Sequence, residues 1–181
     1  QRLEGSYFPA DKLRANPVEG DTVWYLDNGQ QELVRSSHCN TLVVRKTVRE
    51  YGKPLFGPPP AELIPPVSDI ELKREVASVF LDWGEELLAK KDWSQWYVSF
   101  TVNAYCRMLH TLHTGEIGSK PAANRWAIDN LDSRWGSLIE EAWALRDHPE
   151  KTIHVPADPE ITKRTGEFVR MAMELCRQLE Y

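Results

Sequence analysis

The sequence has few cysteines, and they do not form a metal-binding pattern. Its three cysteines, Cys39, Cys106 and Cys176, are far apart, and neither a C-x-x-C motif nor a Cys/His metal spacing occurs. Cys106 and Cys176 stand in apolar helical stretches, which predicts buried thiols. Isolated thiols of this kind are typical of a reducing compartment. We therefore expect a cytoplasmic protein with no metal site of its own.

The chain also lacks a long apolar run and an excess of positive charge. No stretch of about 18 apolar residues is present, so we expect no membrane span. The net charge is -5, with 22 Lys and Arg against 27 Asp and Glu. Nonspecific nucleic-acid binding needs a basic surface, whereas an acidic protein suits a cationic small molecule. The expected partner is therefore a small cationic substrate.

Apolar periodicity divides the chain into a small β part and a larger helical part. Alternation predicts a strand over residues 2–8 and shorter strands over residues 22–26 and 32–35. A helix is predicted over residues 41–51, with Asn40 as its N-cap and Gly52 at its end. Because the chain starts at Gln1, inside a strand pattern and without Met, we expect a trimmed fragment.

Proline dominates the segment that follows. Residues 53–67 contain six prolines, and proline both fixes the backbone angle φ and removes an N–H donor. Such a composition predicts a stiff, extended connector. We place the domain boundary in it.

The rest of the chain has helical spacing with strong start signals. Ser68 with Glu71 is a predicted capping box, Ser119 and Asp132 are predicted N-caps, and Asp158 with Pro159 opens the last helix. The helix over residues 94–113 is apolar nearly all round, which is typical of a central helix. Short connections between five helices predict a bundle. The expected fold is mainly α, with a five-helix C-terminal bundle preceded by a small β piece.

Two cations occupy unusual positions in this bundle. Arg107 lies in the middle of the most apolar helix, where a guanidinium needs a partner. That partner is either a core carboxylate, in a structural ion pair, or an anionic ligand such as phosphate. Lys120 follows the Ser119 cap, where free N–H groups and the helix dipole attract anions. It is either an anion contact or an ordinary surface lysine.

Other polar groups leave two interpretations open. Glu4 stands on the first predicted strand, as a general base, a metal ligand or a solvated edge residue. His110 and His113 have a spacing that fits metal ligation, but no third ligand is evident, which favours a packed or exposed pair.

Aromatic and acidic residues gather near the turn between the first two bundle helices. They are Trp83, Trp93 and Trp96, with Glu85, Glu86 and Asp92. Stacking faces beside carboxylates suit a polycationic sugar. The alternative is an ordinary helix corner with a solvated acidic loop.

Several strings in the sequence resemble one enzyme family. VREYGKPLFGPPPAELIPPVS, then a helix ending in LDW, then CRMLHTLHTGEIGSKPAANRWAIDNL are similar to the streptomycin/spectinomycin adenylyltransferases. GPPPAEL, Arg107 and TGEIxSKxAAxxWA are the most specific parts. The segment RLEGSYFPADKLR resembles the strand that ends the family's catalytic sheet, and the resemblance covers nearly the whole chain.

The resemblance implies that Glu4 is the general base for the substrate hydroxyl, and that Arg107 and Lys120 hold the ATP triphosphate. It implies that Trp83 lies beside the substrate, with Glu86 and Asp92 as candidate acidic contacts. Residues 1–52 would be the remnant of a nucleotidyltransferase α/β domain, and residues 68–181 the substrate and nucleotide-binding bundle. The family's Gly-Ser and D-x-D motif, which holds two Mg²⁺ ions, does not occur here.

Three functions therefore follow. The chain is part of an enzyme that transfers AMP from ATP to a hydroxyl of an aminoglycoside-like substrate, with ATP as cofactor and the Mg²⁺ ligands outside this chain. Alternatively, it is a stand-alone substrate-binding subunit that serves a separate nucleotidyltransferase in trans. A third interpretation is a helical interaction domain with no catalytic role.

Overall fold

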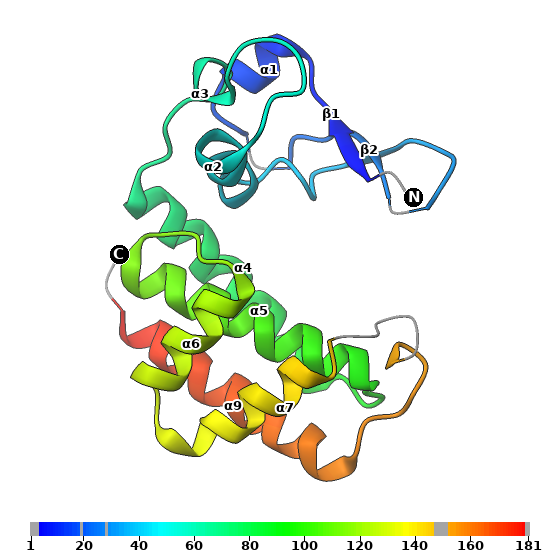
Figure 1. Ribbon diagram of the computed structural model, residues 1–181, viewed down its shortest axis with the longest axis vertical. Coiled ribbons are helices and arrows are strands. Elements are labelled where there is room, and N and C mark those ends of the chain that lie inside the picture. Colours follow the sequence, from blue (N-terminus) through cyan, green and yellow to red (C-terminus); the bar gives the residue numbers. More distant parts are fainter. Residues whose placement is uncertain (1–3, 19, 28, 147–151, 180–181) are drawn as a thin grey trace. The chain divides into compact units, whose positions relative to one another are not determined.

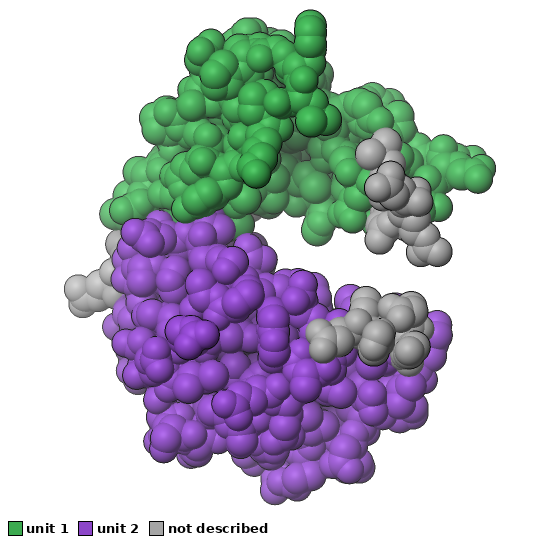
Figure 2. All heavy atoms as spheres, in the orientation of Figure 1, with its two compact units in different colours: residues 1–72 green, residues 73–181 purple. Residues whose placement is uncertain are grey.

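The structure is a computed structural model that describes residues 4–18, 20–27, 29–146 and 152–179. It confirms the predicted class, because most of the chain is helical and a small antiparallel sheet lies near the N-terminus (Figure 1). Two compact units are present, residues 1–72 and residues 73–181, and Figure 2 colours them separately. The boundary falls within the long helix α4, Asp69–Ala89.

The sheet of the first unit has three strands in sequence order. β1 (Gly5–Tyr7), β2 (Val23–Leu26) and β3 (Val34–Ser36) pair antiparallel. The strand predicted over residues 2–8 is shorter in the structure, where β1 covers Gly5–Tyr7. Residues 2 and 3 of the prediction lie outside the described part, and Glu4 stands just before β1. The third strand lies slightly later than predicted. In one cross-strand row Tyr7 pairs with Trp24 and Trp24 with Arg35.

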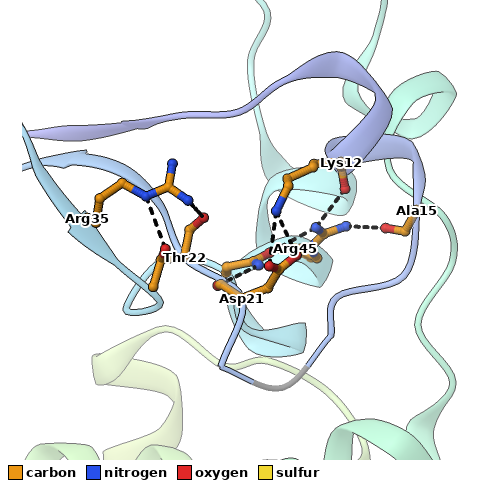
Figure 3. A network of polar contacts seen from close by, with 7 residues as sticks. Lys12, Ala15, Asp21, Thr22, Arg35 and Arg45 are labelled. Carbon is orange, nitrogen blue, oxygen red and sulfur yellow. Dashed lines mark hydrogen bonds and ion pairs between the residues drawn. The ribbon is translucent and has the colours of Figure 1, made fainter.

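A buried arginine ties the helices of this unit to its loops (Figure 3). Arg45, on helix α2 (Leu42–Tyr51), is only 3% exposed. Its guanidinium donates to the carbonyls of Leu13 and Ala15 at 3.1 and 2.6 Å, and to that of Lys12 at 3.0 Å, around helix α1 (Ala10–Arg14). It also donates to the Asn40 Oδ1.

This network explains one wrong prediction. Asn40 does not cap α2, because its side chain binds Arg45 and donates to the Asp21 carbonyl at 3.1 Å. Thr41 is the N-cap instead, and its hydroxyl accepts from the Val44 N–H at 3.2 Å. The helix ends at Tyr51 before Gly52, as predicted.

The proline-rich segment is not extended throughout. A short helix, α3 (Pro60–Leu63), interrupts it. Pro60 is tolerated there because the first helical residue needs no N–H donor. The Ser68 and Glu71 capping box that follows is present: the Glu71 N–H donates to the Ser68 hydroxyl at 3.3 Å, and the Ser68 N–H donates to the Glu71 carboxylate at 3.2 Å.

The second unit is a bundle built from the predicted helices. After α4 come α5 (Gln95–Thr114), α6 (Lys120–Asn130), α7 (Gly136–Ala144) and α9 (Pro159–Gln178). Ser119 caps α6 as predicted, and Asp158 caps α9, the helix that it was predicted to open. Ser94, predicted as the approximate start of its helix, is the N-cap of α5. Asp132 caps a short 3-10 turn, η1 (Ser133–Trp135), that leads into α7.

Helix α5 is the centre of this bundle, as its apolar pattern predicts. It packs against α6, α7 and α9, and the Tyr105 hydroxyl on it donates to the Phe80 carbonyl of α4 at 3.0 Å (Figure 1). Its buried face comprises Val98, Val102, Tyr105, Cys106, Leu109 and Leu112. This packed core fixes the polar residues that α5 carries on its other faces.

A glycine permits the close approach of three helices. A Cβ built on Gly84 of α4 would lie 2.4 Å from the Met173 Sδ of α9 and 2.9 Å from the Tyr105 hydroxyl. Atoms cannot approach so closely without a shift in the core. Gly84 therefore sets the spacing between α4, α5 and α9.

Candidate functional site

A polar strip lies where α5 meets α6 in the second unit. Arg107 on α5 is half-buried, and its Nε donates to the Gly118 carbonyl at 3.1 Å. Gly118 precedes Ser119, which caps α6. The guanidinium therefore lies beside the start of α6, where the helix dipole favours an anion.

Arg107 has no acidic partner among the described residues, which is unusual for a half-buried guanidinium. Burial lowers its pKa below the usual value. The structural ion pair considered from the sequence is thus not formed in this part of the chain. Most of its N–H donors remain available to a ligand.

Lys120 adds a second positive charge to the same place. It is half-buried, and burial lowers its pKa, as do the positive charges of Arg146 and Arg107. Arg107 and Arg146 thus lie close enough to repel Lys120, and none of the three forms a salt bridge with a described carboxylate. An anion bound beside Lys120 would offset this repulsion.

Two buried asparagines form a hydrogen-bonded pair between the helices that carry this strip. Asn103, one helical turn before Arg107, donates to the Ser99 carbonyl at 2.6 Å. Asn124, one turn after Lys120, donates to the Asn103 Oδ1 at 2.6 Å. Both asparagines are buried, so they fix the helix faces that carry the two cations.

The two histidines of α5 pack against one tryptophan. The rings of His110 and His113 lie 5.7 and 5.1 Å from that of Trp126. A Cβ on Gly118 would lie 3.0 Å from the His110 Nδ1, so a larger residue there would require the ring to shift. Both histidines thus pack on Trp126, in agreement with the interpretation that they are a packed pair. No three His, Cys, Asp or Glu side chains of the described residues are grouped to hold a metal ion.

Aromatic rings form a continuous series on α4 and α5. Trp83 contacts Phe100 at 5.6 Å, and Phe100 stacks on Trp96 at 5.0 Å. Trp93 joins through Tyr97 at 5.4 Å. Phe100 is 41% exposed although it is apolar, which gives the series a surface on which a ring can stack.

The acidic residues predicted beside these rings do not form one cluster. Glu86 is exposed on α4, and Glu85 pairs with Arg177 at 3.4 Å. Asp92 lines a groove that Trp83 does not line. Trp83 and Asp92 share no ring contact, ion pair or hydrogen bond in the described coordinates.

Glu4 lies in the first unit and is held by a tyrosine. The Tyr25 hydroxyl donates to the Glu4 Oε1 at 2.7 Å. This bond and the nearby carboxylate raise the pKa of Tyr25. Tyr25 is 8% exposed while Glu4 is exposed, so a rigid donor orients one carboxylate oxygen and leaves the other open to solvent.

Sequence reasoning missed Tyr25, Arg146 and Gly118. Gly5 pairs with Leu26 across β1 and β2, so only a known strand register brings Glu4 near Tyr25. Arg146 approaches Lys120 through the packing of α6 on α7. Gly118 does carry a local signal, because it stands directly before a helix cap.

Comparisons with known proteins bear on the second unit. A search of curated proteins and a search of solved structures each find no match to this chain. The family model described as "Aminoglycoside adenylyltransferase, C-terminal domain" matches residues 62–171. The match spans Arg107, Lys120, Trp83, Glu86 and Asp92, and it does not reach Glu4. No described helix is both long and apolar enough for a membrane crossing. Since the matched segment is more than half of the chain, this protein belongs to the family of the aminoglycoside adenylyltransferase C-terminal domain.

Proposed function

We propose that this chain is part of a nucleotidyltransferase that transfers AMP from ATP to a hydroxyl of an aminoglycoside-like substrate. The observation that carries the proposal is the pair Arg107 and Lys120. Both are half-buried at the start of α6, without carboxylate partners among the described residues, inside the segment that matches the family. A triphosphate would provide the anionic partner that these two cations do not have in the described structure.

The roles of these two cations differ. Arg107 keeps its Nε on the Gly118 carbonyl, so its terminal N–H groups are free to form a fork on phosphate oxygens. Lys120 acts as a point charge at the helix start. Arg146 lies near enough to lower the pKa of Lys120, and in this proposal it adds to the field that attracts the nucleotide.

Glu4 is the proposed general base. The substrate hydroxyl oxygen attacks the α-phosphorus, the bond from that phosphorus to the pyrophosphate oxygen breaks, and Glu4 takes the hydroxyl proton. The Tyr25 hydroxyl occupies the Glu4 Oε1, so Oε2 is the oxygen that accepts the proton. Tyr25 is a positioning residue in this scheme.

The proposed substrate surface is the aromatic series around Trp83. Sugar rings stack on Trp and Phe faces, and Glu86 offers a carboxylate to an ammonium group. Asp92 is a less suitable contact for a polycation, because Lys90, Lys91 and Lys163 line the same groove. We keep Trp83, Glu86 and Asp92 as proposed contacts, in that order.

The domain organisation is part of the proposal. Residues 1–52 are the remnant of a nucleotidyltransferase domain, residues 53–67 the connector, and residues 68–181 the bundle. Magnesium ions bound with ATP would neutralise the triphosphate, with ligands from a nucleotidyltransferase half outside this chain. That half acts in cis, or in trans if the chain is a substrate-binding subunit. The third interpretation, a helical interaction domain, does not account for a half-buried Arg107 without an ion pair among the described residues.

Arg107→Ala should weaken ATP binding by the full chain. Loss of a charge-assisted contact costs about 1.5–3 kcal/mol, or roughly 10–150-fold in affinity. Isothermal titration calorimetry with ATP measures this change. Arg125→Ala is the matched control, because Arg125 is an exposed arginine on α6. Equal losses in the two variants, or no loss in Arg107→Ala, would contradict the assignment.

The chain alone should transfer no AMP, with or without Mg²⁺. Its sequence has no D-x-D motif to align the triphosphate. Labelled ATP with a panel of aminoglycosides tests this expectation, and AMP-drug product from the isolated chain would refute it. Product that forms only after a separate nucleotidyltransferase is added supports action in trans.

A further inference from the structure

A second binding place lies around the turn between α4 and α5, beside the first turn of α5 and away from Arg107. It is a groove of about 740 Å³, within the range of pockets that hold small ligands. One wall is the α4–α5 turn, with Lys90, Lys91 and Trp93. The other is residues 153–157 and the start of α9, with Lys163.

The charge of this groove is opposite to that of the whole protein. Three lysines and one aspartate line it, whereas the chain has a net charge of -5. Lys90, Lys91 and Lys163 form no salt bridge with a described carboxylate. Three lysines that share a groove with a single carboxylate, and that form no ion pair with it, attract an anion.

Aromatic rings form the floor beside these charges. Trp93 and Tyr97 contact each other edge to face at 5.4 Å, and both line the groove. The Lys90 Nζ lies 4.5 Å from the centre of the Tyr97 ring, so this ammonium is held at the ring face and not at a carboxylate. A ligand ring can therefore pack on an aromatic surface while its anionic group meets ammonium groups.

Backbone hydrogen bonds hold the two walls together. The Gln95 N–H donates to the Val155 carbonyl at 2.9 Å, and the Ala157 N–H donates to the Trp93 carbonyl at 2.8 Å. Ser94 and Pro156 form an isolated antiparallel bridge. The groove thus exists before a ligand binds, which reduces the entropy lost on binding.

We infer that this groove binds a small molecule that combines a ring with a phosphate or carboxylate group. The inference does not depend on the proposed adenylyl transfer, because Arg107 and Lys120 do not line the groove. It also differs from the polycation that Asp92 suggested from the sequence. Lysines outnumber the single aspartate among the described lining residues, so an anionic group is favoured in the groove.

The test is a charge series on one ring, measured by calorimetry on the full chain. Phenyl phosphate, benzyl alcohol and benzylamine carry a negative, a neutral and a positive group. We expect phenyl phosphate to bind about tenfold or more tightly than the other two, and to weaken as salt is added. Inorganic phosphate should bind more weakly than phenyl phosphate, because it lacks the ring. Benzylamine or inorganic phosphate at equal affinity, or no binding of phenyl phosphate, would overturn the inference.

Variants locate the binding place. The double variant Lys91→Ala with Lys163→Ala should weaken phenyl phosphate binding by about tenfold or more. Arg170→Ala removes an exposed cation from the same helix α9 outside the groove, and should leave the affinity unchanged. A loss in Arg107→Ala with none in the lysine double variant would place the ligand at the α6 start and refute the inference.

Discussion

In a protein that joins this chain to its nucleotidyltransferase half, Glu4→Gln is expected to lower the turnover number by about 10²–10⁴-fold. Glutamine keeps the size and the bond from the Tyr25 hydroxyl, but it cannot accept the substrate proton at neutral pH. The affinity for ATP should stay nearly unchanged, since Arg107 and Lys120 hold the triphosphate in this proposal. One steady-state assay that yields both the turnover number and the affinity for ATP measures the effect.

Two companion variants separate chemistry from binding. Arg107→Ala should weaken ATP binding strongly, which is the opposite signature. Tyr25→Phe removes the donor to the Glu4 Oε1 and should lower turnover less than Glu4→Gln does, because the carboxylate remains. Near wild-type turnover in Glu4→Gln would show that Glu4 is not the general base but a solvated residue beside β1.

Arg45→Met should destabilise the first unit by roughly 3–5 kcal/mol. The methionine fills much of the space, but the carbonyls that receive the guanidinium donors lose their partner. Hydrogen exchange of the β2 and α2 amides reports on this unit separately from the bundle. The bundle amides should exchange at their original rates.

Arg35→Met is the matched control for that experiment. Arg35 is exposed on β3, and its guanidinium bonds to the Thr22 hydroxyl and carbonyl at 3.1 and 2.7 Å (Figure 3). Water replaces those bonds readily, so the loss should stay below about 1 kcal/mol. Similar exchange rates in the two variants would mean that the Arg45 network does not stabilise the unit.

Local chemistry was enough to predict the bundle. Caps such as Ser119 and Asp158 act within one helical turn, so their effect can be read from neighbouring residues. Asn40 shows where this fails, because a residue with good capping chemistry is used by Arg45, which no local pattern reveals. The short helix α3 was missed because three prolines in a row suggested extended backbone, although Pro60 can begin a helix.

Some residues of the candidate site could also be predicted from local sequence, and others could not. Arg107 and Lys120 were noticed because each contradicts its local pattern, as a charge in an apolar helix or a cation in a first turn. Arg146, Tyr25 and the lysine groove depend on segments that meet only after folding. Asp92 was grouped with Glu85 and Glu86 without its neighbours Lys90 and Lys91, and Lys163 reaches the same groove only through the packing of α9.

The small sheet has a consequence for handling the protein. Within the described residues β1 pairs only with β2, so its outer edge carries unsatisfied backbone groups. Trp24 and Tyr7, neighbours in one cross-strand row, are 47% and 52% exposed. An open edge beside exposed aromatic rings is a template for self-association. Solutions of this chain should therefore become turbid as concentration rises, and a lysine placed at Tyr7 should delay the onset.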